Sequence, residues 1–255
     1  MPATAPRLIA EKQFHDAQAA DRSATFRRTP HGLRFTDVDF LDHETWVRPA
    51  FDALGDLRGK RALDYGCGHG MAAVVMARAG AEVSAFDLSP GYVAEAERRA
   101  AANGVTVDFT AADAEHLPYP DASFDAVWGN AILHHLDLDR AGAELKRVLA
   151  PGGVAVFCEP WGGNPLLEFA RRRLPYPGKQ RTADEQPLTA AALAPLRHHF
   201  PTLHVRGFQL FGMVRRVCRV RPALRMADAL DRVALRAVPS ARNWCRYVVL
   251  TVRKE

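Results

Sequence analysis

The sequence predicts an α/β fold built on a doubly wound, mostly parallel sheet. Short apolar runs typical of buried strands alternate with stretches of helical periodicity. A glycine-rich turn joins the first run to the first helix, and an acidic residue stands at or after the end of each of the first three runs. Parallel sheets buried on both faces bind ligands at the carboxyl ends of their strands, so these residues are expected to share one site.

The first strand, turn and helix are expected at Arg61–Tyr65, Gly66–Gly70 and Met71–Arg78. Glycine at three alternate positions brings backbone close to a ligand, and the turn presents the free N–H groups of a helix N-terminus. Cys67 inside the turn is expected to be a small packing residue. Asp64 precedes the first glycine, and a carboxylate there repels a pyrophosphate but attracts an ammonium or sulfonium. The turn therefore predicts a ligand with cationic groups.

The second strand, Ala81–Asp87, ends on a carboxylate that can accept hydrogen bonds from both hydroxyls of a ribose. Asp87 could instead only cap the helix that begins near Pro90. The third strand is expected at Val105–Thr110, with Asp113 following it.

The fourth strand is expected at Phe124–Asn130, followed by a helix from about Asp139 to Leu149. Pro151 and the two glycines after it stop this helix and set the reversal into a fifth strand, Val154–Glu159.

Four features in this order resemble the class I methyltransferases that use S-adenosylmethionine (SAM). They are the glycine turn with Asp64, the strand-end Asp87, the segment LPYPDASFD (Leu117–Asp125) and the segment RVLAPGG (Arg147–Gly153). The LPYPDASFD segment is most similar to the branch of the family acting in ubiquinone and menaquinone biosynthesis.

The resemblance implies a Rossmann-like sheet of seven strands with an antiparallel last strand, in which Thr202–Phe208 and Tyr247–Arg253 form the final hairpin. It also implies SAM as cofactor and S-adenosylhomocysteine as product. In the family the residue matching Asp113 accepts from the adenine amino group, with the equivalents of Leu88 and Ala114 on the ring faces. The backbone of Asn130 matches a position that meets the methionine part. The expected cofactor residues are Asp64, Gly66, Cys67, Gly68, Gly70, Asp87, Leu88, Asp113, Ala114 and Asn130.

Methyl transfer is an in-line displacement that needs a base only if the acceptor carries a proton. His134 and His135, after the fourth strand, are the first candidates, and His134 is preferred. His15 and Glu159 follow. Each has a structural alternative, since paired histidines also serve packing and Glu159 could bind a cation or stabilise the following turn. No cluster of ligands has metal-site spacing, so no metal is expected.

Residues 1–58 are expected to form an N-terminal helical lid over the cofactor, with helical stretches at Phe14–Ala20 and Phe40–Trp46 and residues 1–8 disordered. Residues 59–255 form the SAM-binding domain. An insertion at about residues 160–200, after the fifth strand, is expected to recognise the substrate and includes Arg171–Arg173 and Pro175–Thr182.

The net charge of +5 is unevenly distributed. Leu63–Asp125 holds ten acidic and three basic residues, whereas Arg206–Lys254 holds twelve basic and two acidic ones. The arginines from Arg215 to Arg225 predict an amphipathic helix interrupted at Pro222, with a solvated face on a helix packed against the sheet. An anionic substrate, an acidic carrier protein or an anionic lipid are alternatives. Nucleic acid is not expected, because aromatic residues do not interleave with the arginines.

No run of about 18 apolar residues and no secretory segment occurs, so no membrane span is expected. The four scattered cysteines indicate reduced thiols and a cytoplasmic protein.

The leading hypothesis is a SAM-dependent methyltransferase acting on a small molecule, such as a natural-product intermediate with an aromatic or isoprenoid part. A SAM-binding protein that does not methylate, for example a cyclase, is a second hypothesis. A nicotinamide-dependent oxidoreductase is a third, disfavoured by Asp64, Asp113 and the glycine spacing. The sequence leaves the acceptor atom and the oligomeric state open.

Overall fold

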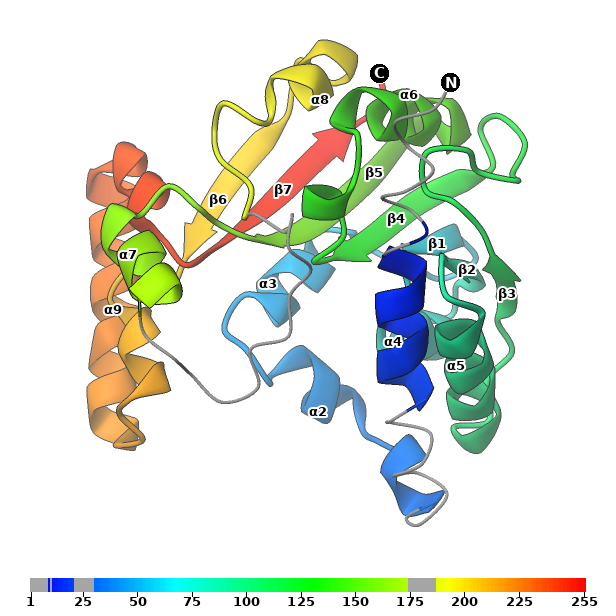
Figure 1. The fold of residues 1–255 in the computed structure, drawn as a ribbon, viewed down its shortest axis with the longest axis horizontal. Helices are drawn as coiled ribbons and strands as arrows, with labels where there is room; N and C mark the ends of the chain where they lie inside the picture. The colour runs from blue at the N-terminus through cyan, green and yellow to red at the C-terminus, as the bar shows by residue number, and fades with distance from the viewer. Residues whose placement is uncertain (1–8, 10, 21–29, 174–186) are drawn as a thin grey trace.

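The computed structural model describes residues 9, 11–20, 30–173 and 187–255, with a seven-stranded sheet at its centre (Figure 1). The strand order is β3-β2-β1-β4-β5-β7-β6, and β7 runs antiparallel to both of its neighbours while the other pairs are parallel. The strands are β1 (Arg61–Tyr65), β2 (Glu82–Asp87), β3 (Asp108–Ala111), β4 (Phe124–Asn130), β5 (Leu149–Pro160), β6 (His204–Phe208) and β7 (Tyr247–Arg253). The predicted fold class is confirmed.

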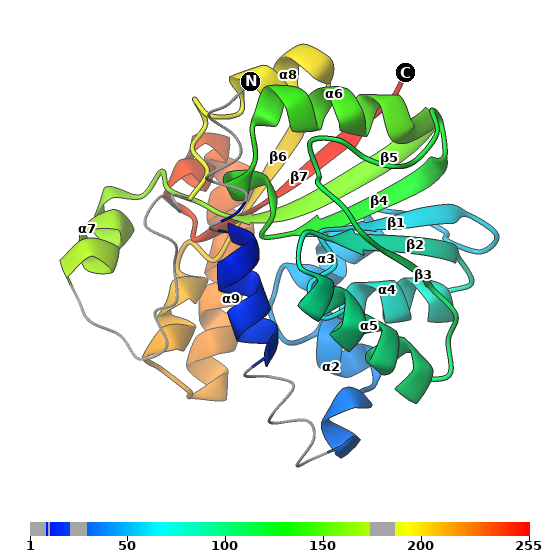
Figure 2. The ribbon, with the colours of Figure 1, turned by 45° about the vertical axis from the view of Figure 1, so that its right-hand side comes forward.

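Helices cover both faces of the sheet (Figures 1 and 2). On one face lie α6 (Leu138–Val148) and α8 (Ala194–His199), whose Leu145 and Leu196 join a core with Phe157. On the other lie α2 (Asp37–Leu41), α3 (Val47–Asp52), α4 (Met71–Arg78) and α5 (Pro90–Ala102). Met76 of α4 and Trp128 of β4 belong to this second core. The 3-10 helix η1 (Pro30–Leu33) contacts α5, and the 3-10 helix η2 (Leu133–His135) contributes Leu133 to the first core.

The strands β1, β4 and β7 and the helix α4 begin and end at the predicted residues. The third strand starts later than predicted, because the chain after α5 is still closing that helix: Gly104 has φ +69° and the N–H of Val105 donates to the carbonyl of Ala100. The fifth strand starts earlier, because Leu149 already pairs with Phe124 of β4.

The N-terminal segment contains the expected helix, which the structure describes over residues 11–20. The second expected stretch, Phe40–Trp46, is wrong as a single helix, because α2 ends at Leu41 and α3 begins at Val47. In the expected insertion the structure has α7 (Pro165–Arg173), which carries Arg171–Arg173. Residues 1–8 and Pro175–Thr182 lie outside the described residues.

The C-terminal arginine-rich segment differs from the prediction. Pro222 does not interrupt a helix but stands in the first turn of α9 (Arg221–Ala237), where its missing N–H costs nothing. The residues before it form the 3-10 helix η3 (Gly212–Arg216). The helix α9 packs against η3 and against η4 (Pro239–Trp244) rather than flat on the sheet. Across the described residues, no helix combines the length and apolarity that crossing a bilayer requires.

Candidate functional site

A cavity of about 260 Å³ opens at the carboxyl ends of β1, β2 and β4. This is the point where the sheet order reverses, with β2 on one side of β1 and β4 on the other. All of the expected cofactor residues except Gly70 line it. Those that line it are Asp64, Gly66, Cys67, Gly68, Asp87, Leu88, Asp113, Ala114 and Asn130.

The glycine turn after β1 uses its glycines for different purposes. All three have positive φ, which only glycine adopts without strain. A Cβ on Gly70 would lie 2.6 Å from the Cβ of Ala96, so this glycine lets α4 pack against α5. A Cβ on Gly68 would meet nothing within 4 Å, although Gly68 lines the cavity. Gly68 therefore leaves open a space that a ligand can fill.

Asp64 is a buried carboxyl at the base of the cavity. One oxygen accepts the N–H of Ala73 in the first turn of α4, at 2.9 Å. Burial raises the pKa of Asp64 to about 7, and this single hydrogen bond opposes the rise. A desolvated carboxyl with one partner is well suited to gain a cationic group, such as an ammonium.

Asp87 at the end of β2 organises the rim of the cavity. Its oxygens accept the N–H of Gly68 at 2.8 Å and the N–H of Ser89 at 2.9 Å. Burial raises the pKa of Asp87, and the two backbone donors oppose the rise. Each oxygen keeps a second lone pair, so the carboxyl can still accept from a hydroxyl. Ser89 rather than Asp87 caps α5, by accepting the N–H of Tyr92.

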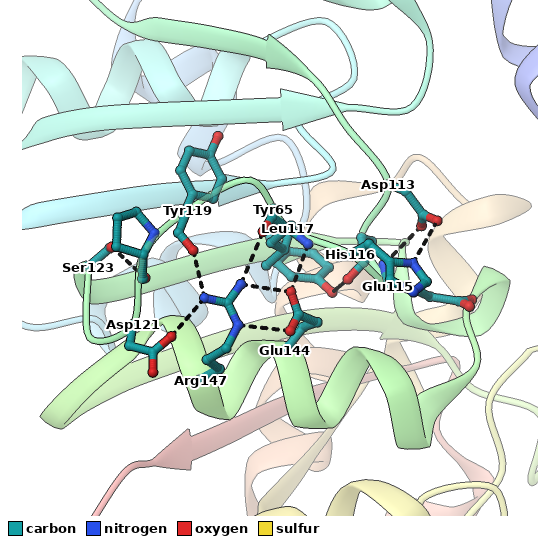
Figure 3. A network of polar contacts seen from close by, with 12 residues as sticks. Tyr65, Asp113, Glu115, His116, Leu117, Tyr119, Asp121, Ser123, Glu144 and Arg147 are labelled. Carbon is teal, nitrogen blue, oxygen red and sulfur yellow. Dashed lines mark hydrogen bonds and ion pairs between the residues drawn. The ribbon is translucent and has the colours of Figure 1, made fainter.

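Asp113 lies beyond β3, in a short turn fixed by buried hydrogen bonds (Figure 3). Its carboxylate accepts the N–H of Glu115, and the hydroxyl of Tyr65 donates to the carbonyl of Ala114 at 2.8 Å. The Glu115 carboxylate in turn accepts the N–H of Asp137. The first strand thus positions the segment that carries the third carboxylate.

The two sequence segments that resemble the family most closely meet around Arg147 (Figure 3). Its guanidinium donates to the carbonyls of Leu117 and Tyr119 and pairs with Asp121 and Glu144. These contacts raise the pKa of Arg147, first through Glu144 and then Asp121. Both segments stay away from the cavity, so they stabilise the loop before β4 rather than carry chemistry.

The preference for His134 as a base is not supported by its position. His134 does not line the cavity, and its Nδ1 lies 2.7 Å from the Glu159 carboxylate, with both side chains buried. The other oxygen of Glu159 accepts the N–H groups of Ile132 and Leu133. Glu159 therefore anchors the loop after β4, through three contacts and away from the cavity.

His135 and His15 both line the cavity, with ring centroids 5.9 Å apart. The Nδ1 of His135 lies 3.6 Å from the carboxylate of Glu11, and both side chains are about nine-tenths buried. The buried Nδ1 of His15 has no hydrogen-bond partner among the described residues. The structure therefore presents a carboxylate–histidine pair beside a second histidine.

Sequence reasoning missed the side chains that the helix at residues 11–20 and α5 bring to the cavity. Glu11, Gln18 and Tyr92 line it. The Tyr92 hydroxyl donates to Gln18 at 2.8 Å, and Ser89 is hydrogen-bonded to Asp16. No motif marks these residues, because their spacing along the chain carries no signal before the helix docks on α5.

Two further kinds of reactive group, a cysteine nucleophile and a metal site, have no support in the described residues. Burial raises the pKa of the Cys67 thiol well above its usual value, so it stays protonated, as a packing residue does. No group of three or more His, Cys, Asp or Glu side chains with metal-site geometry occurs in the described part of the chain.

Residues 63–157 match a protein family described as a methyltransferase domain. A demethylmenaquinone methyltransferase from Thermus thermophilus is 41% identical over 142 residues, covering 52% of this chain and 64% of the relative. The matched regions span 40% to 64% of the length of the curated relatives.

Solved structures with the same fold cover more of the chain. The cyclase SpnF is 25% identical with a TM-score of 0.53, covering 83% of both chains. Geranyl diphosphate C-methyltransferase from Streptomyces coelicolor, solved with S-adenosyl-L-homocysteine, is 18% identical with a TM-score of 0.57. The match covers 82% of this chain and 78% of the geranyl diphosphate C-methyltransferase chain.

Proposed function

We propose that residues 63–157, which match a methyltransferase domain, form a class I SAM-dependent methyltransferase domain and that the chain methylates a small molecule. The acceptor class that we propose is a natural-product or quinone-like intermediate. The demethylmenaquinone methyltransferases among the relatives support a quinone-like acceptor.

One observation carries the proposal: the carboxylates at three successive strand ends line one cavity. In it Asp64 would hold the cofactor ammonium, Asp87 the ribose hydroxyls and Asp113 the adenine amino group. The groups fit, because Asp64 is desolvated with one partner and Gly68 leaves its Cβ position open to the cavity. When bound, SAM supplies an electrophilic methyl group on a sulfonium.

His135 is the residue that we propose as base for an acceptor that carries a proton. The Glu11 carboxylate, 3.6 Å from Nδ1, favours the tautomer with the proton on Nδ1 and leaves Nε2 to accept one. His15, whose ring lies next to His135, would orient the acceptor. His134 and Glu159 would keep the loop that carries His135 in place.

Residues 1–58 are proposed as the lid of this site, supported by Glu11, His15 and Gln18 lining the cavity and by the contacts of Asp16 and Gln18 with α5. A docked helix would exclude water from the transferring methyl group. We further propose a cytoplasmic location, which the four free thiols support.

A second candidate, use of SAM without methyl transfer, is favoured by the likeness to the cyclase SpnF. Binding and turnover separate the possibilities. Isothermal titration with SAM, S-adenosylhomocysteine and NADH should show binding of the first two only. Incubation with SAM and quinone, phenol or isoprenoid acceptors should then release S-adenosylhomocysteine in amounts equal to methylated product.

Binding of NADH alone would overturn the proposal. Tight binding of SAM together with conversion of an acceptor that gains no methyl group would favour the second candidate.

A further inference from the structure

The helix α9 has three distinct faces along its length. Residues spaced for one face, among them Ala227 and Asp231, are buried against η3 and η4. A second row holds the arginines Arg221, Arg225, Arg232 and Arg236. A third row, at the spacing i, i+4, i+7 and i+11, holds Met226, Leu230, Val233 and Ala237.

The third row is apolar but faces solvent. Met226 is 63% exposed, Leu230 49% and Val233 66%. The segments on either side of α9 expose further apolar side chains, which are Val217, Val220, Val238 and Trp244. Exposed apolar side chains aligned along one helix face mark an interaction surface rather than ordinary scatter.

The arginine row lacks acidic partners. Asp228 is already paired with Arg215 at 2.6 Å, and Asp231 accepts the N–H groups of Phe211 and Gly212. Arg225, Arg232 and Arg236 make no ion pair with any residue that the structure describes.

A groove of about 720 Å³ between α9 and the edge strand β6 gathers more positive charge beside the row. Arg232 and Arg236 line it from α9, and Arg206 and Arg242 line it from β6 and η4. Asp228 and Asp231 also line the groove, but Arg215 and the N–H groups of Phe211 and Gly212 already engage them. The surface therefore joins an exposed apolar row to a groove whose arginines can bind phosphate groups.

We propose that α9 binds the surface of a membrane containing anionic phospholipid. The row of Met226, Leu230 and Val233 enters the boundary between headgroups and acyl chains, while the neighbouring arginines contact headgroup phosphates. A second copy of the chain fits this surface less well, because a symmetric pairing through the apolar row would bring two sets of unpaired arginines together. The inference does not depend on the reaction catalysed.

Flotation of the full chain with vesicles tests the proposal. We expect binding to vesicles of phosphatidylcholine mixed with phosphatidylglycerol, no binding to phosphatidylcholine alone, and weakening as salt is raised. Leu230→Asp should weaken binding by at least about tenfold, and Arg225→Gln by roughly fivefold. Leu230 and Arg225 are exposed, so both variants should fold, which circular dichroism and SAM affinity check.

Matched controls lie elsewhere on the surface. Val38 in α2 is 60% exposed, and Arg58 lies after α3. Val38→Asp and Arg58→Gln make the same kinds of substitution away from α9, so both variants should bind vesicles as the wild type does.

Equal loss in the control and test variants would overturn the proposal, because net charge alone would then explain binding. Absence of phosphatidylglycerol-dependent binding would overturn it too. Tight binding of inorganic pyrophosphate with no vesicle binding would assign the groove to a free phosphate compound instead. Self-association that Leu230→Asp abolishes, without vesicle binding, would assign the row to a second copy.

Discussion

Asp64 is a carboxyl whose protonation near neutral pH the fold changes. Its pKa, about 7 in the folded chain against a usual 3.8, means that the folded state holds the proton more tightly than the unfolded one. Between about pH 4 and about pH 7 the contribution of Asp64 to the stability of the free protein should therefore fall as pH rises. A bound ammonium favours the ionised form, so SAM affinity should rise through the upper part of the same window.

Titration calorimetry from about pH 6 to about pH 8 measures this effect. Asp64→Asn should bind SAM about tenfold or more weakly at pH 8 and lose the pH dependence, because a charged hydrogen bond contributes roughly 1.5–3 kcal/mol. A wild-type affinity that stays constant across the window would remove Asp64 from the cofactor site.

Substitutions of the two neighbouring histidines, His134 and His135, should have different effects. His135→Ala should lower the rate of methyl transfer by roughly 10²- to 10⁴-fold and leave SAM affinity unchanged, as loss of a general base does. Glu11→Gln should cost less and shift the pH profile of the rate. His134→Ala should instead lower the free energy of unfolding, because it leaves the buried Glu159 without one partner. Equal rates in wild type and His135→Ala for a proton-bearing acceptor would disprove the assignment.

The residues of the site that the sequence could predict are those close to the strands. The carboxylates Asp64, Asp87 and Asp113 and the glycine turn could be found because strand ends are visible in the pattern. The choice between His134 and His135 could not be predicted. It depends on which ring contacts Glu159, which lies 25 positions after His134. Glu11 carries no signal at all until its helix docks.

At the scale of elements, substitutions of Gly70 and Gly68 in the turn between β1 and α4 should have different effects. Gly70→Ala forces a Cβ against Ala96 and adopts a strained φ, so it should lower the free energy of unfolding by about 2 kcal/mol or more. Gly68→Ala carries a similar φ strain but meets no atom in the fold. It should lose only about 1–2 kcal/mol of stability, while SAM affinity falls because its Cβ occupies ligand space.

Urea unfolding and calorimetry measure the two effects, and Gly55→Ala, which also has positive φ and an open Cβ position, serves as the control for strain. Unchanged SAM affinity in Gly68→Ala would show that the turn does not approach the cofactor.

Element boundaries followed the sequence wherever local signals agreed. The helix α4 begins after Gly70 and β4 follows a turn-rich segment, and both match their predicted residues. The arginine-rich region failed this rule, because Pro222 reads equally as a break within a helix and as a first-turn residue. Only the packing of α9 on η3 and η4 decides between these readings.

For the whole molecule, cofactor binding should appear as added stability. S-adenosylhomocysteine at about 100 times its Kd should contribute about 2.7 kcal/mol, which corresponds to a rise in Tm of roughly 5–10 °C. Hydrogen exchange in residues 11–20 should slow at the same time, because that helix lines the cavity and is hydrogen-bonded to α5. NADH at the same concentration serves as the control and should leave both readouts unchanged. A rise in Tm without protection of residues 11–20 would argue against their role as a lid.

The number and direction of the strands were the most predictable property of the molecule. Alternating strands and helices favour parallel neighbours, and the resemblance supplied the antiparallel end. The placement of α9 and the individual contacts of the N-terminal helix were not predictable, because both depend on packing between distant segments.

With Asp64 as the proposed partner of the cofactor ammonium, uptake of SAM should release protons. A carboxyl that is part protonated near neutral pH must give its proton to the solvent when an ammonium takes its place beside it. The buffer takes up that proton, so the measured heat of binding should depend on the buffer. Binding should be more exothermic in an amine buffer, whose protonation releases much heat, than in phosphate, whose protonation releases little. Comparison of two such buffers at pH 7 would count the protons released per molecule of SAM bound.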